Sequence, residues 1–375
     1  MTYISNMPTA ACIHVYIIDG TMSRLVPGEE TNTGLLYRLL EELGPRRGQT
    51  VGYHPGVQGE GVGKWLSIAA GAGINLAITE AYAALAARYR AGDRIMLFGF
   101  SRGAYAVRSL AGFIGRVGLV RCEDATERNI ARAFRLYEAA TVTDETRAFR
   151  AAHCHERVMI EALGVWDTVK ALGLPYPVVS RLAPMATEFH DEGLTAEVRN
   201  AFQALALDED RLAYAPMPWR VSDDWPGRVE QMWFAGTHGD VGGHVWNAPE
   251  ARPLANIAFR WLVGRAEACG LILPDGWADR FPVDPGAATK GNRSGRARLF
   301  WDRAPRIVGA CSSEAVHPSV VRRMRLVPGY HPRADHAEEI LARVTGQNAA
   351  VAREVYLQPP VKGVTRRMRA RITWR

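Results

Sequence analysis

The chain has 375 residues, of which 47% are hydrophobic and 23% charged, an ordinary composition for a globular protein with a core large enough to bury a catalytic site. Its formal net charge of +7 favours anionic partners, either phospholipid headgroups or nucleic acid, although a solvated basic surface is the simpler explanation. Five scattered cysteines without a CxxC pair exclude a readable disulfide framework and favour a reducing compartment. Because no basic region precedes an apolar core and no apolar run could span a bilayer, we expect cytoplasmic synthesis without a Sec signal or a transmembrane helix.

Apolar, β-rich runs alternate along the chain with segments of helical periodicity. We predict strands at Cys12–Ile18, Val51–Tyr53, Arg94–Phe98, Arg157–Leu163 and Arg228–Phe234, and helices at Thr31–Leu43, Ile74–Tyr89, Ala104–Val117 and Leu254–Ala268. This alternation predicts an α/β fold, with a mostly parallel central sheet flanked by helices on both faces. In such sheets the chemistry lies at the carboxyl ends of the strands.

We interpret residues 1–375 as a single domain with insertions. Residues 121–152 are charged and helical in character, and residues 172–227 are rich in proline and tryptophan; we expect both to be insertions or parts of a lid. Residues 274–375 are expected to be a loop-rich C-terminal extension packed on the core.

The strongest motif is Gly99-Phe100-Ser101-Arg102-Gly103, which fits G-x-S-x-G between a predicted strand and a predicted helix. The sharp turn would expose the Ser101 hydroxyl at the top of the sheet, and the two glycines leave room for the strained backbone. The Arg102 N–H would supply one oxyanion donor. The alternative is a turn serine flanked by glycines.

A serine of this kind needs an acid and then a histidine later in the chain. Asp167 follows a predicted strand in Gly164-Val165-Trp166-Asp167-Thr168 and is the preferred acid, whereas Glu161 lies inside the strand run. His238 is the preferred base because it lies in a glycine-rich loop directly after a strand, where Asp240 could fix the loop by hydrogen bonding.

Two other histidines and one cluster were weighed. His244 is close enough to His238 to be an alternative base, whereas His317 follows no recognisable strand. The run His153-Cys154-His155-Glu156 has no second ligand cluster at a useful spacing, so we expect no metal site and no cofactor.

Three longer segments carry a family resemblance. AGDRIMLFGFSRGAYAVRSLAGFIGRVGL, GVWDTV and WFAGTHGDVGG resemble the catalytic domain of the type VI secretion phospholipase effector-like family. Shorter matching stretches extend the resemblance over about residues 13–332; they are Asp19-Gly20-Thr21, Thr31-Asn32, Tyr53–Val57, Ala204–Glu209 and Glu314–Ser319.

The resemblance implies an α/β-hydrolase fold with an esterase triad of Ser101, Asp167 and His238, and places Gly20 or Thr21 beside the nucleophile as a second oxyanion donor. Family members hydrolyse membrane glycerophospholipids as antibacterial effectors. The implied partners are therefore a lipid substrate, a membrane surface and a secretion or immunity protein, with export by a signal-independent system. Differences from the usual pattern at Met22-Ser23, Lys170 and His244-Val245 leave the substrate open.

The sequence thus predicts a serine esterase acting on glycerophospholipids through an acyl-enzyme, with no nucleic acid partner. A soluble carboxylesterase acting on small esters is the alternative enzyme. A hydrolase-like binding protein is the alternative outside catalysis, because in Lys362–Arg375 arginines alternate with apolar residues and could contact phosphate. A solvated terminal segment is the simpler explanation of that tail.

Overall fold

The computed structural model describes residues 11–44, 48–56, 72–139, 141–169, 193–222, 225–292 and 302–334. Its strands are β1 Ile13–Ile18, β2 Gln49–His54, β3 Arg94–Phe100, β4 Met159–Trp166, β5 Asn200–Ala206, β6 Arg228–Phe234 and β7 Glu314–Val316. Its α-helices are α1 Asn32–Glu42, α3 Ala72–Ala86, α4 Arg102–Val117, α5 Glu127–Glu138, α6 Asp144–His153, α7 His238–Gly242, α8 Arg252–Ala268 and α9 Pro318–Leu326. Short 3-10 turns lie at Cys122–Asp124 (η1), Leu212–Tyr214 (η2), Pro249–Ala251 (η3) and Trp277–Arg280 (η4).

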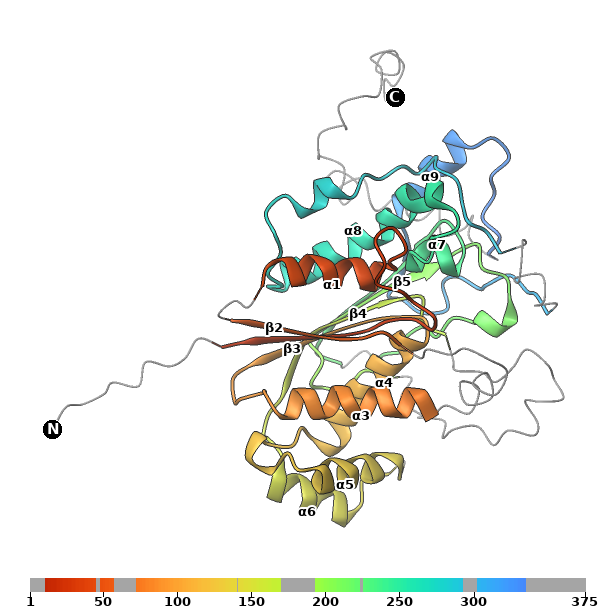
Figure 1. Cartoon of the computed structure of the whole chain (residues 1–375). Coiled ribbons are helices and arrows are strands. Elements are labelled where there is room, and N and C mark those ends of the chain that lie inside the picture. Colours follow the sequence, from red (N-terminus) through yellow and green to blue (C-terminus); the bar gives the residue numbers. More distant parts are fainter. Residues whose placement is uncertain are drawn as a thin grey trace.

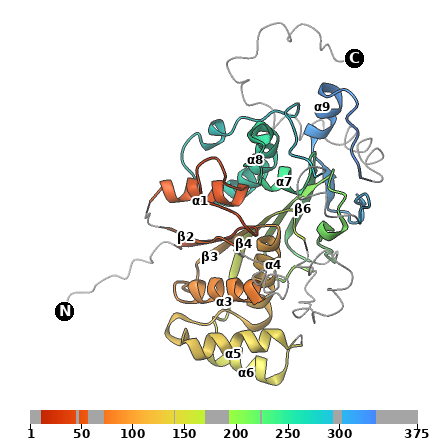
Figure 2. The ribbon, with the colours of Figure 1, turned by 45° about the vertical axis from the view of Figure 1, so that its right-hand side comes forward.

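The strands form one sheet in the order β2-β1-β3-β4-β5-β6-β7, and every pairing between neighbours is parallel. Helices α1, α7 and α8 cover one face, whereas α3 and α4 cover the other, with α5 and α6 packed beneath them (Figures 1 and 2). The predicted α/β architecture with a parallel central sheet is therefore confirmed. Its carboxyl strand ends share one edge, which places the loops after β1, β3, β4, β5 and β6 together.

Both faces of the sheet are buried, because successive side chains of each strand point to opposite sides. In β1, Val15 and Ile17 join the core beneath α1 and α8, while Tyr16 and Ile18 join the core beneath α3 and α4. Such strands read as nearly continuous apolar runs, which is why the sequence predicts β1, β3 and β4.

Two strands of the sheet were not predicted. β5 has the sequence NAFQALA, whose alanines favour helix, yet it lies between β4 and β6 with Ala201, Ala204 and Ala206 fully buried. Residues 200–206 therefore belong to the central sheet, although they fall within the range 172–227 that we expected to form an insertion or a lid. β7 has only three residues, too few for a periodic pattern, and it lies within the expected C-terminal extension.

Residues 121–152 contain η1, α5 and α6, in agreement with their predicted helical character. Both helices have threonine caps: Thr126 accepts from the Asn129 N–H, and Thr143 and Thr146 form a capping box. Residues 172–192, 223 and 224 of the range 172–227, and the whole basic tail Lys362–Arg375, lie outside the described residues. Within the described ranges, no helix is long and apolar enough to cross a membrane.

Candidate active site

Ser101 lies on a strained turn between β3 and α4. Its backbone has φ 58° and ψ −121°, a conformation that costs energy for a residue with a side chain. The flanking glycines make the turn possible: a Cβ at Gly99 would lie 2.5 Å from the Gly103 carbonyl oxygen, and one at Gly103 would lie 2.2 Å from the Ile18 carbonyl oxygen. The turn therefore packs directly against the end of β1.

The parallel register brings Ser101 and Asp167 together. Phe100 is paired with Trp166, so the next residues of β3 and β4 emerge side by side at the carboxyl edge. The Ser101 N–H donates to the Trp166 carbonyl over 3.0 Å, and the Asp167 N–H donates to the Ala204 carbonyl of β5 over 2.7 Å. Asp167 also has a positive φ of 41°, so both side chains follow a strand on an unusual backbone turn.

His238 bridges these two side chains from the loop after β6. Its Nε2 lies 2.9 Å from Ser101 Oγ and its Nδ1 lies 2.6 Å from Asp167 Oδ2. The ring is buried between Phe100 and Tyr214, with a centroid distance of 4.8 Å to each. An ionised Asp167 accepts a hydrogen bond from the Nδ1–H group. The unprotonated Nε2 then directs its lone pair at the serine hydroxyl. The structure thus brings together all three residues of the predicted triad.

Arg306 holds the carboxylate of Asp167 from the side opposite the histidine. Its Nη1 donates to Asp167 Oδ1 over 2.6 Å and its Nη2 donates to Oδ2 over 3.0 Å, and the Ala206 N–H donates to Oδ1 over 2.9 Å. Burial opposes ionisation, but the Arg306 charge and the His238 hydrogen bond hold the pKa of Asp167 well below its usual range. Sequence reasoning missed Arg306, because no motif links two residues so distant in the chain.

A second carboxylate fixes the backbone of the histidine loop. Glu209 Oε2 accepts the His238 N–H over 3.1 Å, while Arg211 and Asn292 donate to the same carboxyl group. Although Glu209 is buried, its hydrogen bonds from Arg211 lower its pKa to about 2, so it stays ionised. Glu209 lies in the ALALDE segment, which the family resemblance contained without giving it a role.

Asp240 stabilises the same loop in the manner expected from the sequence. Its Oδ2 accepts from the Thr237 N–H and hydroxyl, both over 2.8 Å, and its Oδ1 accepts the Lys290 N–H over 2.6 Å. α7 therefore begins at His238 with a capping box. Neither ring nitrogen of His238 is needed to hold the loop, so both remain available to Ser101 and Asp167.

The loop after β1, Asp19-Gly20-Thr21 (the DGT loop), contains both residues expected to supply the second oxyanion donor. The Gly20 N–H donates to the buried Asp19 carboxylate over 2.6 Å, so this donor is already used within the loop. In the described part of the chain, the Thr21 hydroxyl is buried without a hydrogen-bond partner. Asp19 in turn accepts from the hydroxyls of Thr31 and Thr33, which fixes the loop. Of the two expected residues, Thr21 is therefore the one whose donor is not used within the loop, and the Arg102 N–H belongs to the open first turn of α4.

The competing residues lie elsewhere. Glu161 is inside β4, where it accepts from Asn200 Nδ2 over 3.4 Å. His244 Nε2 accepts from Trp246 Nε1 over 3.1 Å, and burial together with Lys290 lowers the pKa of His244 to about 3. Neither of them contacts the serine hydroxyl.

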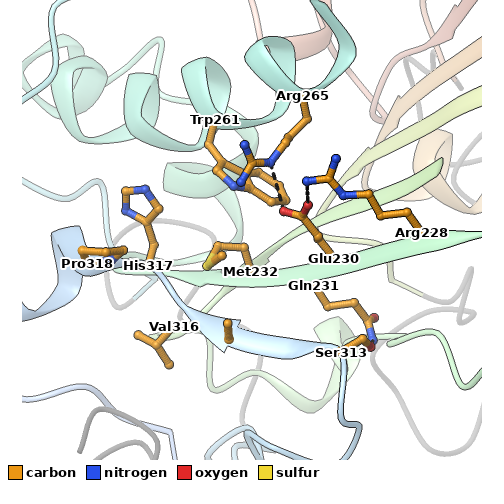
Figure 3. A pocket seen from close by; sticks show the side chains of 11 residues that line it. Arg228, Glu230, Gln231, Met232, Trp261, Arg265, Ser313, Val316, His317 and Pro318 are labelled. Carbon is orange, nitrogen blue, oxygen red and sulfur yellow. Dashed lines mark hydrogen bonds and ion pairs between the residues drawn. The ribbon is translucent and has the colours of Figure 1, made fainter. Parts of the chain in front are cut away.

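His317 does follow a strand, β7, contrary to the sequence interpretation, but it belongs to a different place. It lines a cavity of about 280 Å³ between β6, β7 and α8, together with Trp261, Met232 and an ionic group in which Glu230 pairs with Arg265 (Figure 3). Its Nδ1 accepts the Ser319 N–H, and burial lowers the pKa of His317 to about 3. Sequence reasoning rejected His317 as the base for the wrong reason.

The cluster at His153–Glu156 shows no ligand arrangement. His153 Nδ1 lies 3.2 Å from Asp124, and the Cys154 thiol donates to the Val117 carbonyl. Across the described ranges, no group of three or more His, Cys, Asp or Glu side chains is placed to hold a metal ion.

The fold and the site define an α/β protein in which a serine, a histidine and an aspartate lie in hydrogen-bonding contact at the carboxyl edge of a parallel sheet. Residues 14–265 match the model of the family described as "T6SS, Phospholipase effector Tle1-like, catalytic domain". The chain belongs to this family.

Three individual proteins are also similar to the chain. Uncharacterized protein YEL023C of Saccharomyces cerevisiae is 29% identical over 239 residues, which cover 55% of the chain and 33% of that protein. A crystal structure of an uncharacterized protein from Pseudomonas aeruginosa covers 73% of the chain and 49% of its own, with 16% identity and a TM-score of 0.45. The Tle1 effector bound to the VgrG spike from the type 6 secretion system covers 62% and 51%, with 19% identity and a TM-score of 0.33. The chain spans about a third of the curated relative and about half of each solved structure.

Proposed function

We propose that the protein is a serine esterase of the α/β-hydrolase type that cleaves acyl esters of glycerophospholipids through an acyl-enzyme. The observation that carries this proposal is the continuous contact from Ser101 Oγ through His238 to Asp167, at 2.9 and 2.6 Å. Membership of a phospholipase effector family supports the lipid substrate. A secretion apparatus and an immunity protein are the partners that this family membership favours.

In the proposed reaction, His238 Nε2 takes the hydroxyl proton as Ser101 Oγ bonds to the ester carbonyl carbon. The Arg102 N–H and Thr21 donate to the resulting oxyanion. When the carbonyl re-forms, the alcohol leaves with the proton from Nε2. A water molecule then attacks the acyl-enzyme, gives a proton to Nε2, and releases the fatty acid as the proton returns to Ser101.

Exposed apolar side chains in the surrounding loops support a lipid surface as the place of action. Met22 belongs to the DGT loop, where its backbone has a positive φ of 60°, and Leu212 belongs to the same turn as Tyr214. Trp246 follows α7, and Ile307 is adjacent to Arg306. Single exposed apolar residues are common on protein surfaces, but several of them around one site can enter a bilayer interface together.

The substrate class is tested by comparing fatty-acid release from phospholipid vesicles with hydrolysis of short nitrophenyl esters. We expect kcat/KM to be at least about tenfold higher on vesicles, because remote binding energy contributes to the rate only with the longer substrate. Equal or better hydrolysis of the short esters would instead favour the soluble carboxylesterase. Absence of any ester hydrolysis would favour a binding protein.

The pH dependence of the reaction is set by His238. Burial outweighs the stabilising charge of Asp167, so the pKa of His238 lies below its ordinary value of 6.5. Only the neutral ring can accept the serine proton, so kcat/KM should be level at neutral pH and fall as the pH drops through this lowered pKa. Asp167 does not titrate in this range, because its own pKa is held far lower. An acid limb with its midpoint above pH 7, in a kcat/KM profile on a soluble ester, would contradict this assignment.

A further inference from the structure

The Arg102 side chain belongs to the residue directly after the nucleophile, at the start of α4. It is partly buried, and no carboxylate in the described part of the chain pairs with it. Three other arginines around the site are matched: Arg306 pairs with Asp167, Arg211 with Glu209, and Arg303 with Asp210. Carboxylates of the protein therefore neutralise these three charges, whereas none in the described ranges neutralises the charge of Arg102.

The position of Arg102 connects it with the reacting atoms. It is the residue directly after the nucleophile, and its guanidinium is close enough to the Tyr214 hydroxyl to interact electrostatically. The Tyr214 ring packs on His238 at a centroid distance of 4.8 Å. Arg102 is therefore close to Tyr214, which packs on the histidine that contacts Ser101.

Leaving an arginine partly desolvated and unpaired is unfavourable, and burial lowers the pKa of Arg102. An arriving anion would remove this cost, and the planar guanidinium matches a phosphate with two parallel hydrogen bonds. In a glycerophospholipid the phosphate is separated from the nearer acyl ester by only two carbons of the glycerol unit. A cation adjacent to the nucleophile is therefore where that phosphate must come when the ester carbonyl lies at Ser101.

We propose that Arg102 is the substrate-recognition residue that binds the headgroup phosphate of a glycerophospholipid. This inference rests on the proposed function and deepens it. It assigns Arg102 two separate parts in the site: the backbone N–H faces the oxyanion, and the guanidinium faces the phosphate. An Arg102 substitution keeps the N–H and removes only the guanidinium, so the two roles can be separated by experiment.

The test compares wild type and Arg102→Gln on a phospholipid and on the diacylglycerol with the same acyl chains, both in the same detergent micelles. Loss of a bidentate bond to a charged group should lower kcat/KM on the phospholipid about 10- to 100-fold more than it lowers kcat/KM on the diacylglycerol. Arg102→Lys keeps the positive charge but not the planar guanidinium. Its kcat/KM on the phospholipid should lie between those of wild type and Arg102→Gln. Arg135→Gln is the matched control, because it removes the same charge from an exposed position on α5. Equal loss on both substrates would show a structural role and overturn the proposal.

A binding measurement keeps the inference independent of catalysis. A diether phospholipid has no scissile ester, and we expect Arg102→Gln to weaken its binding by about tenfold or more, measured by calorimetry. Unchanged diether binding would overturn the proposal even if the wild type is an active esterase. Inorganic phosphate binding as tightly as the diether lipid would assign Arg102 to free phosphate and overturn the lipid assignment. If diether binding depends on Arg102 but the protein hydrolyses no ester, the proposed esterase function is wrong and the assignment of Arg102 stands.

Discussion

Ser101→Ala is expected to lower kcat for ester hydrolysis by about 10,000- to 1,000,000-fold, because it removes the hydroxyl that His238 Nε2 contacts. The remaining rate would come from oxyanion donors and substrate binding. The Ser101 hydroxyl makes no structural contact apart from His238 in the described residues, so the free energy of unfolding should change by less than about 1 kcal/mol. Fatty-acid release from vesicles and the thermal midpoint measure the two effects.

Ser109→Ala is the matched control. Ser109 is a buried serine of α4, the helix that Ser101 precedes, and it is not part of the proposed triad. It should retain wild-type activity within about threefold. A fluorophosphonate probe supplies a second readout, because it reports an activated serine without requiring the natural substrate. Labelling of Ser101→Ala equal to that of the wild type would locate the nucleophile elsewhere.

The parts of the site that could be predicted from sequence are those with a local cause. The strained turn at Ser101 needs glycines on both sides, and it stands between a visible strand and a visible helix. Asp167 and His238 each follow a strand end, and the parallel topology brings such ends to one edge. A pattern of a few adjacent residues is therefore enough to place each of them.

The parts that sequence reasoning missed depend on contacts between distant segments. Arg306 lies in a loop without periodicity, and only the folded chain shows that it pairs with Asp167. Glu209 follows β5, the alanine-rich strand that was not recognised, so its place beneath the histidine loop could not be inferred. The choice between Gly20 and Thr21 also depended on a contact, because only the structure shows that the Gly20 N–H is occupied by Asp19.

In the candidate site, strained backbone and buried charge occur at neighbouring residues. Ser101 and Asp167 both have positive φ angles, and both are held by main-chain hydrogen bonds to the neighbouring strand. The acid is clamped between Arg306 and His238, so it can neither rotate nor become neutral easily. This arrangement favours a fixed imidazole tautomer over a mobile one, which is what the proposed base requires.

Asp167→Asn tests this clamp, and it should impair the protein in two distinct ways. The kcat is expected to fall by about 10,000-fold, because a neutral amide no longer imposes the productive histidine tautomer. The free energy of unfolding should also fall by about 3 to 5 kcal/mol, because the buried Arg306 guanidinium loses its counterion. Kinetics on a soluble ester and denaturant unfolding separate the two losses.

The double variant Asp167→Asn/Arg306→Met distinguishes the structural from the catalytic part. Without either buried charge, the unpaired cation is gone and most of the lost stability should return, whereas kcat should stay as low as in the single variant. Arg306→Met alone should leave Asp167 partly held by Ala206 and His238, and should raise the pKa of Asp167 toward its ordinary range. Recovery of activity in the double variant would show that the Asp167 carboxylate serves only to neutralise Arg306. The proposed triad would then have no acid.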